Sequence, residues 1–465
     1  MLTYSFENTG SDPMYVYLYK CIKNDISAGK IKAGEKLPSK RSFAKNLGIS
    51  VITIEGAYGL LSDEGYIYSL PKKGFYVSDL KCPADAGETP GSRNVVLSSG
   101  GNAYIADFSS NQTDTEIFPF SIWAKAMRAV MLDKRDELMV NPPCGGIMEL
   151  REAIAEYLLE FRGMNVRPSQ IIIGAGTEYL YSLLIQLLGR KNVFGIENPG
   201  YHKAAKIYER TEIPYEYVDI DASGVMAGEL DKKNITVIHT SPSHHFPTGI
   251  VMPVSRRYEL LGWANAAPGR YIIEDDYDSE LRMNGKPLPT LYGIDVSGKV
   301  IYMNTFTKTL CSTVRISYMV LPEGLAERFY KTLSFCSCTV SNFEQYTLER
   351  FMREGSFEKH INRLRRFYQG KRDALLGAMY GHPLNKFIRI QEKEAGVHFI
   401  MEVKTDRPEE SVTAAARAGG VKLCPLSEYY HGQTPERDNI YVMNYSSLRQ
   451  ENIDAAVDII YGAVR

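Results

Sequence analysis

A lysine among hydroxyl residues follows an apolar run in the second half of the chain. Lys308 comes five residues after Val300–Met303, and Arg315 follows seven residues later. A lysine amine can form a Schiff base with an aldehyde, and an arginine can hold a phosphate through two parallel hydrogen bonds. Thr305 and Thr307 add hydroxyls that donate and accept hydrogen bonds. The stretch therefore indicates a covalent site for a phosphorylated aldehyde, with an ordinary surface turn as the alternative.

Residues that could bind a ligand or take part in a reaction follow four other apolar runs. After 171–173, 193–197, 235–240 and 271–274 come a glycine turn, a tyrosine, two histidines and an aspartate. A glycine turn into a helix offers N–H groups to an anion, although most such turns only change direction. A lone tyrosine is more often core, and an aspartate can cap a helix, bind a metal or pair with a buried cation. The adjacent histidines are not expected to bind a metal, because no acidic or thiol partner has suitable spacing.

One ligand, pyridoxal 5'-phosphate (PLP), would use groups from all these positions. It needs a lysine for its aldehyde, an aspartate at its pyridinium nitrogen, an anion site and an aromatic face. We therefore predict Lys308 at the aldehyde, Asp275 at the nitrogen and Tyr201 on the ring, with Tyr277 at the phenolic oxygen. The predicted phosphate site is Gly176, Thr177, Thr305 and Arg315, and Thr307 completes the predicted cofactor-binding set.

The elements that must carry these residues alternate along the chain. From Asp107 onward the pattern strand, turn, helix repeats, which predicts an α/β fold with a mainly parallel sheet. Parallel sheets bind ligands at the carboxyl ends of their strands. All five apolar runs would therefore deliver their polar residues to one edge.

Composition limits the class of protein. The chain has 465 residues, 44% of them hydrophobic and 23% charged, with a net charge of −1, which predicts a soluble protein of two to four domains. No apolar run approaches the length of a membrane span, and residues 1–10 lack the apolar core of a signal peptide. The seven cysteines are scattered and odd in number, so we expect a reducing cytoplasm.

The first 78 residues have a different pattern. A helical apolar face, a short helix over 40–47, a glycine turn and a third helix after Ser50 are typical of a helix-turn-helix. Two short β runs then flank Pro71–Gly74, a hairpin whose tip carries Lys72 and Lys73. Residues 13–77 hold ten basic and five acidic side chains, a balance of +5. The pattern predicts a winged helix, against the simpler interpretation of a helical cap with a solvated lysine loop.

The stretch GEKLPSKRSFAKNLGIS resembles the signature of the GntR superfamily. The resemblance covers 13–78 and implies that this domain binds DNA. One departure is Val51, where the family usually has an arginine after the serine that opens the recognition helix. A contact with a thymine methyl group could replace that arginine. The residues that the resemblance places at DNA are Ser39, Arg41, Ser50 and Thr53, with Lys72 and Lys73 in the wing.

The remainder resembles the aminotransferase domain, of fold type I, found in MocR/GabR-type regulators. The matching segments include GGIMELREAIAEYL, ENPGYH, SPSHHFPTG, EDDYDSE and TFTKTLCSTVRISYMVLP. We predict a winged helix-turn-helix domain over 1–78, a flexible linker over 79–104 and an aminotransferase-like effector domain over 105–465. The resemblance also implies a head-to-tail, domain-swapped homodimer.

Three departures from working aminotransferases concern the substrate. Phe246 stands where these enzymes commonly have an asparagine, and Val442 stands where an arginine holds the substrate carboxylate. Val140 stands where a tyrosine often reaches the phosphate in the other subunit. Because cofactor-binding parts are present while substrate-binding parts are altered, the sequence favours sensing over turnover.

The resulting prediction is a PLP-dependent transcriptional regulator and not an enzyme. Weak half-transamination is compatible with this prediction. An amino compound would displace Lys308 from the cofactor and form an external aldimine in its place. This exchange would change operator binding. The resemblance makes γ-aminobutyrate a candidate effector, with Lys203 as the cation for its carboxylate. Three alternatives stay open: a regulator of vitamin B6 synthesis that senses PLP, a working aminotransferase, and a PLP-binding protein whose winged helix binds protein.

Overall fold

The computed structural model describes residues 2–4, 6, 12–79, 104–283, 288–391, 395–432 and 438–465. The chain divides into two compact units, Met1–Gly100 and Gly101–Arg465. The predicted linker over 79–104 falls on residues outside the described ones, apart from Asp79 and Tyr104. The two units are therefore described separately.

The small unit is a three-helix bundle with a β hairpin, as predicted. The strands β1 and β2 pair antiparallel, and the helices bury one apolar face each, including Leu18, Ile54 and Tyr58. Ser39 and Ser50 cap α2 and α3, accepting hydrogen bonds from the backbone N–H groups of Ser42 and Thr53. The elements are α1 (Met14–Ser27), α2 (Lys40–Leu47), α3 (Val51–Asp63), β1 (Ile67–Leu70) and β2 (Gly74–Val77).

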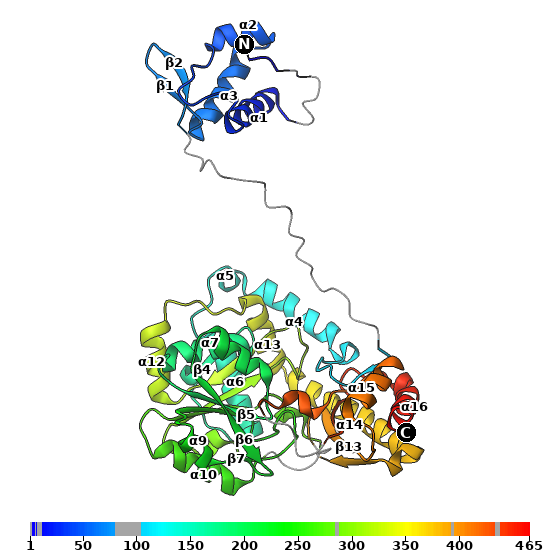
Figure 1. Cartoon of the computed structure of the whole chain (residues 1–465). Coiled ribbons are helices and arrows are strands. Elements are labelled where there is room, and N and C mark those ends of the chain that lie inside the picture. Colours follow the sequence, from blue (N-terminus) through cyan, green and yellow to red (C-terminus); the bar gives the residue numbers. More distant parts are fainter. Residues whose placement is uncertain are drawn as a thin grey trace. The chain divides into compact units, whose positions relative to one another are not determined.

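An eight-stranded sheet forms the centre of the large unit (Figure 1). Its inner strands β10, β9, β8, β5 and β6 are parallel, while β11 and β7 are antiparallel to their neighbours. The prediction of a mainly parallel sheet is confirmed. In spatial order the strands are β4 (Ile171–Gly174), β11 (Ser317–Val320), β10 (Val300–Thr305), β9 (Tyr271–Asp275), β8 (Val237–Thr240), β5 (Phe194–Asn198), β6 (Tyr215–Asp221) and β7 (Gly224–Val225).

Side-chain alternation along these strands supplies two cores. Ile171 and Ile173 belong to one apolar cluster, while Ile172 between them belongs to another. Strands buried on both faces read as continuous apolar runs, because each face packs against helices. Figure 1 shows α7 on one side of the sheet and α9 and α10 on the other. The helices up to α12 are α4 (Phe120–Asp133), α5 (Arg135–Leu138), α6 (Met148–Arg162), α7 (Thr177–Leu188), α8 (His202–Arg210), α9 (Ala227–Lys232), α10 (Val254–Asn265), α11 (Leu291–Ile294) and α12 (Glu323–Leu333).

A smaller antiparallel sheet of order β12-β13-β15 follows the long helix α14 in sequence. A two-stranded parallel pair, β3 with β14, joins the start of the unit to its C-terminal part. Within the described ranges, no helix combines the length and apolar composition needed to cross a lipid bilayer. The remaining elements are α13 (Asn342–Arg353), α14 (Ser356–Gly381), α15 (Glu409–Ala418), α16 (Ile453–Val464), β3 (Ala106–Asp107), β12 (Ile388–Gln391), β13 (His398–Val403), β14 (Val421–Lys422) and β15 (Ile440–Asn444).

Candidate functional site

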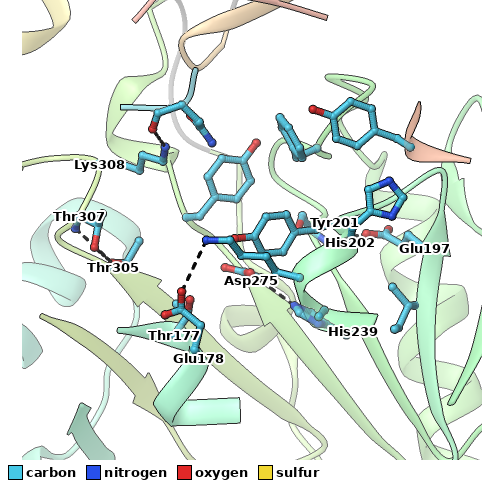
Figure 2. A pocket seen from close by; sticks show the side chains of 18 of the residues that line it. Thr177, Glu178, Glu197, Tyr201, His202, His239, Asp275, Thr305, Thr307 and Lys308 are labelled. Carbon is cyan, nitrogen blue, oxygen red and sulfur yellow. Dashed lines mark hydrogen bonds and ion pairs between the residues drawn. The ribbon is translucent and has the colours of Figure 1, made fainter. Parts of the chain in front are cut away.

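A cavity of about 420 Å³ lies at the carboxyl ends of the central strands, beside the N-terminus of α7 (Figure 2). The chain positions its residues through strand ends: β9 ends at Asp275, β10 ends at Thr305, and Lys308 follows in the next turn. The structure thus brings the predicted cofactor residues together, with Gly176 at the N-cap of α7. The predicted residues that line the cavity are Thr177, Tyr201, Lys203, Asp275, Tyr277, Thr305, Thr307, Lys308 and Arg315.

Lys308 is held in place at the cavity wall. Its Nζ donates a hydrogen bond of 2.7 Å to the backbone carbonyl of Asn111, from the segment before α4. Burial lowers the pKa of Lys308 to about 8, and the Lys203 charge lowers it as well, against an opposing contribution from Asp278. Only a neutral amine attacks an aldehyde, so a lowered pKa suits Lys308 for a Schiff base.

Asp275 presents one carboxylate oxygen without a partner. Its Oδ2 accepts a hydrogen bond of 2.9 Å from Tyr181 and lies 3.4 Å from Nε2 of His239. Its Oδ1 is buried and has no hydrogen-bond partner in the described structure. A buried polar atom without a partner is costly. A protonated ring nitrogen would satisfy this oxygen, so the site fits PLP at this position.

Aromatic side chains form the other walls of the cavity. Tyr201 packs edge-on against Phe246 with ring centroids 6.3 Å apart, and Phe246 contacts Tyr429 in the same way at 5.2 Å. The Tyr277 hydroxyl lies 3.3 Å from Nδ1 of His244. These rings can enclose a planar ligand.

The predicted phosphate site combines a glycine turn, hydroxyls and a cation. Gly176 has φ +95°, a conformation that favours glycine, and a Cβ there would lie 2.2 Å from the Arg315 guanidinium, which would have to move. The Thr305 hydroxyl donates a 2.8 Å hydrogen bond to the Thr307 hydroxyl. The Arg315 guanidinium donates a hydrogen bond of 2.7 Å to Glu178 in the first turn of α7.

Lys203 lies at this same end of the cavity. Its Nζ is 3.8 Å from Oε1 of Glu178, and its side chain is 63% exposed. The structure therefore places the predicted effector cation beside the phosphate residues. Its assignment to an effector carboxylate stays a prediction.

The three departures from working aminotransferases have clear structural settings. Val442 is 1% exposed and belongs to a small apolar cluster with Ile400, Cys424 and Leu426. Phe246 and Tyr429 pack against that cluster from the cavity side. Val140 is exposed, and its carbonyl accepts a hydrogen bond from the Asn342 side chain.

Sequence reasoning missed several residues of the site. Tyr181 and His239 hold Asp275, Asn111 holds Lys308, and Glu178 pairs with Arg315. Tyr181 lies one helical turn after Thr177, so the position of the helix could have indicated it. Asn111 lies 197 positions from Lys308, and no local pattern joins them.

The adjacent histidines have separate partners. His244 Nδ1 lies 2.8 Å from Asp278 Oδ2, whereas His245 Nδ1 lies 2.7 Å from the Thr248 hydroxyl. His245 Nε2 is 3.4 Å from Glu197, a buried carboxylate whose pKa burial raises to about 7. In the part of the chain that the structure describes, no three histidine, cysteine or acidic residues form a metal-binding group.

In the small unit the predicted DNA residues divide into two kinds. Ser39 and Ser50 serve as helix caps, and the Ser50 hydroxyl lies 2.8 Å from that of Thr53. Three basic residues predicted to contact DNA, namely Arg41, Lys72 and Lys73, are exposed. Val51 and Ile52, at the start of α3, are 41% and 79% exposed. The helix start thus offers apolar groups of the kind that contact thymine methyls.

Comparison with known families divides the chain in the same way. Residues 14–77 match the family described as bacterial regulatory proteins of the gntR family. Residues 104–446 match aminotransferase class I and II. The second match covers most of the chain.

Relatives that are regulators share this whole arrangement. The chain is 36% identical to the HTH-type transcriptional regulator YdeL of Bacillus subtilis, over 91% of each chain. It is 30% identical to the probable rhizopine catabolism regulatory protein MocR of Rhizobium meliloti, over 97% of this chain and 94% of that one. It is 28% identical to the HTH-type pyridoxine biosynthesis transcriptional regulator PdxR of Corynebacterium glutamicum, over 93% and 92%.

Solved structures show the fold of the large unit. A multiple substrate aminotransferase from Thermococcus profundus superposes with a TM-score of 0.69 at 23% identity, over 82% of this chain and 95% of that one. The kynurenine aminotransferase of Pyrococcus horikoshii gives 0.66 at 24%, over 78% and 92%. With a gntR-type helix-turn-helix followed by a fold-type I aminotransferase domain, the chain belongs to the MocR-type transcriptional regulators.

Proposed function

We propose that the protein regulates transcription in the cytoplasm, with PLP as the resident group of its effector domain and an amino compound as its signal. The observation that carries this proposal is that two unusual groups line one cavity. They are Lys308, whose pKa is lowered, and Asp275, whose Oδ1 has no hydrogen-bond partner in the described structure. A structural lysine needs neither a low pKa nor a partnerless carboxylate nearby.

Several residues in and around the cavity would hold the cofactor. The aldehyde of bound PLP supplies a reversible covalent bond to amines, either Nζ of Lys308 or the amino group of an effector. Asp275 would hold a proton at the ring nitrogen of the cofactor, and Tyr181 and His239 orient its carboxylate. Arg315 and the first turn of α7 attract the phosphate.

The signal must distinguish two arrangements of the protein. An effector changes operator affinity only if it binds one arrangement more tightly than the other. We propose a head-to-tail, domain-swapped homodimer as the unit that changes. An effector that displaces Lys308 frees its Nζ, and the free amine can then donate the hydrogen bond to the Asn111 carbonyl that the structure shows. That segment precedes α4 and follows the connection to the DNA-binding unit in sequence.

Two signals have support. γ-Aminobutyrate is one candidate amine, for which Lys203 would bind the carboxylate. PLP itself is the other, because one relative is named a regulator of pyridoxine biosynthesis. Aminotransferases have an arginine where this chain has the buried Val442. An amino acid in the cavity would therefore find no cation at that position, which supports sensing without turnover.

The test combines cofactor spectra with operator binding. Amines and PLP would be titrated into the purified protein while absorption and the anisotropy of a labelled operator, selected from random DNA, are recorded. We expect both signals to change over one concentration range. A spectral change that leaves DNA binding constant for every amine, and for PLP, would contradict the proposal.

The DNA part has a test of its own. Lys72→Ala/Lys73→Ala should weaken binding to all sequences and make it less salt-dependent, by about one unit of logarithmic slope per lost phosphate contact. A matched control, Lys331→Ala/Lys386→Ala, removes two exposed lysines of the large unit. Wild-type affinity of the wing variant at every salt concentration would reject the role of these lysines.

A further inference from the structure

Glu178 occupies an unexpected place for an acidic residue. It stands in the first turn of α7, beside the glycine turn that is expected to bind a phosphate. Its Oε2 accepts a 2.7 Å hydrogen bond from Arg315, and its Oε1 lies 3.8 Å from Lys203. A Cβ on Gly176 would lie 2.9 Å from Oε2, so this oxygen sits over the glycine turn. The carboxylate thus fills the site that a phosphate would take.

A simpler account is that Glu178 only complements the dipole of α7. Acidic residues are common in the first turn of helices for that reason. Glu323 in the first turn of α12 fits this account, because it pairs with Arg167 at the surface and is 64% exposed. Glu178 instead lines the cavity. Burial raises the pKa of the Glu178 carboxyl group, but hydrogen bonds from the backbone N–H of Glu178 and from Arg315 outweigh it, so the pKa is lowered.

A carboxylate and a phosphate cannot share these partners without cost. Both are anions, and like charges a few Å apart repel strongly where water is partly excluded. A bound phosphate would need Arg315 and N–H groups at the start of α7, and Glu178 engages Arg315 and its own N–H. The glutamate must therefore move away, or remain and weaken the binding of the phosphate.

We propose that Glu178 is an internal competitor for the phosphate site of the cofactor. Its carboxylate pairs with Arg315 and lies near Lys203, the cations that a phosphate at this site would also attract. On loading, the phosphate displaces the carboxylate from Arg315. This competition weakens the affinity for PLP, so that occupancy follows the concentration of PLP. The inference rests on the proposed cofactor site and deepens it into a regulated one.

The test measures the affinity of cofactor-free protein for PLP, pyridoxal and inorganic phosphate. Glu178→Gln keeps the size of the side chain and removes the charge. We expect the Kd for PLP to fall roughly tenfold or more, and the Kd for inorganic phosphate, from phosphorus NMR, to fall as well. The Kd for pyridoxal, which has no phosphate, should change less than twofold. Glu323→Gln, which removes the same charge from another helix start, should change none of the three.

The sign of the change decides between two roles. If Glu178 merely positions Arg315, the substitution will weaken PLP binding, and that result or an unchanged Kd overturns the proposal. Glu178→Ala gives a second variant should the first unfold, with the same expected sign. Failure of the proposed function looks different: borohydride would then fix no cofactor on Lys308 in any variant.

Discussion

The two ends of the cavity have opposite characters. At the cofactor end, Lys308, Asp275 and Arg315 supply the charges that PLP requires, each held by a hydrogen bond. The wall formed by Phe246 and Tyr429, here called the effector end, covers an apolar cluster that contains Val442. The cofactor end retains the groups of an aminotransferase, whereas the effector end lacks the arginine that orients a substrate. Under the proposed function, this difference separates the holding of PLP from the turnover of a substrate.

The largest effect is expected from removing the lysine of the cofactor end. Lys308→Ala should abolish covalent attachment of PLP, because Lys203, the other described lysine of the cavity, lies beside Glu178 among the predicted phosphate residues. The visible absorption band should disappear while the melting temperature and circular dichroism stay close to wild type. Borohydride reduction followed by peptide mapping should find the cofactor on Lys308 in the wild type. Cofactor on a different lysine would contradict the assignment.

The second effect concerns the phosphate alone. Gly176→Ala places a methyl group 2.2 Å from Arg315 at a residue with φ +95°. The strain and the displaced guanidinium should weaken PLP binding by roughly 100-fold, or about 3 kcal/mol. Gly189→Ala is a matched control, since Gly189 has the same φ at the other end of α7 and no atom within 4 Å of an added Cβ. Pyridoxal binding should respond much less than PLP binding.

The cofactor end was largely predictable and its fine structure was not. Apolar runs that end in Asp275, Thr305 and the turn before Lys308 can be found by local pattern, and a parallel sheet gathers such ends at one edge. The pairing of Arg315 with Glu178 joins residues 137 positions apart. Side-chain packing in three dimensions decides such contacts, and neither periodicity nor spacing contains them.

The DNA-binding unit shows the same limit. Its helices and hairpin follow from apolar periodicity, a capping serine and a lysine-tipped turn. Val51 and Ile52 at the start of α3 are exposed because no other described element of this unit packs on that side of the helix. The sequence showed Val51 as a departure, and only the structure shows its exposure together with that of Ile52.

A third effect is the pH dependence of cofactor attachment. With a pKa of about 8, Lys308 is neutral in about a tenth of molecules at pH 7 and in half at pH 8. The rate at which cofactor-free protein forms its visible band should therefore rise several-fold between these values and level off above pH 9. Stopped-flow absorption over this range would measure it. A rate that still rises nearly tenfold between pH 8 and pH 9 would instead show a lysine with an ordinary pKa.

The smallest expected effect restores the missing part of the effector end. Transamination requires the breaking C–H bond of the substrate to stay perpendicular to the cofactor ring, and small misplacements cost heavily in rate. With Val442 at the position of the substrate-binding arginine, the wild type should give at most about one keto product per cofactor. Val442→Arg should raise the first-turnover rate with an α-amino acid several-fold, because a guanidinium holds a carboxylate through two hydrogen bonds.

This gain will be limited by the apolar surroundings. Val442 is 1% exposed, so a buried, charged arginine should cost on the order of several kcal/mol of folding stability. Val442→Lys is the matched control: it adds the same charge without the forked geometry, and should raise the rate less. If the wild type itself completes many turnovers with an amino donor and a 2-oxo acid, the two ends of the cavity do not differ in function. The protein would then be a working aminotransferase joined to a DNA-binding domain.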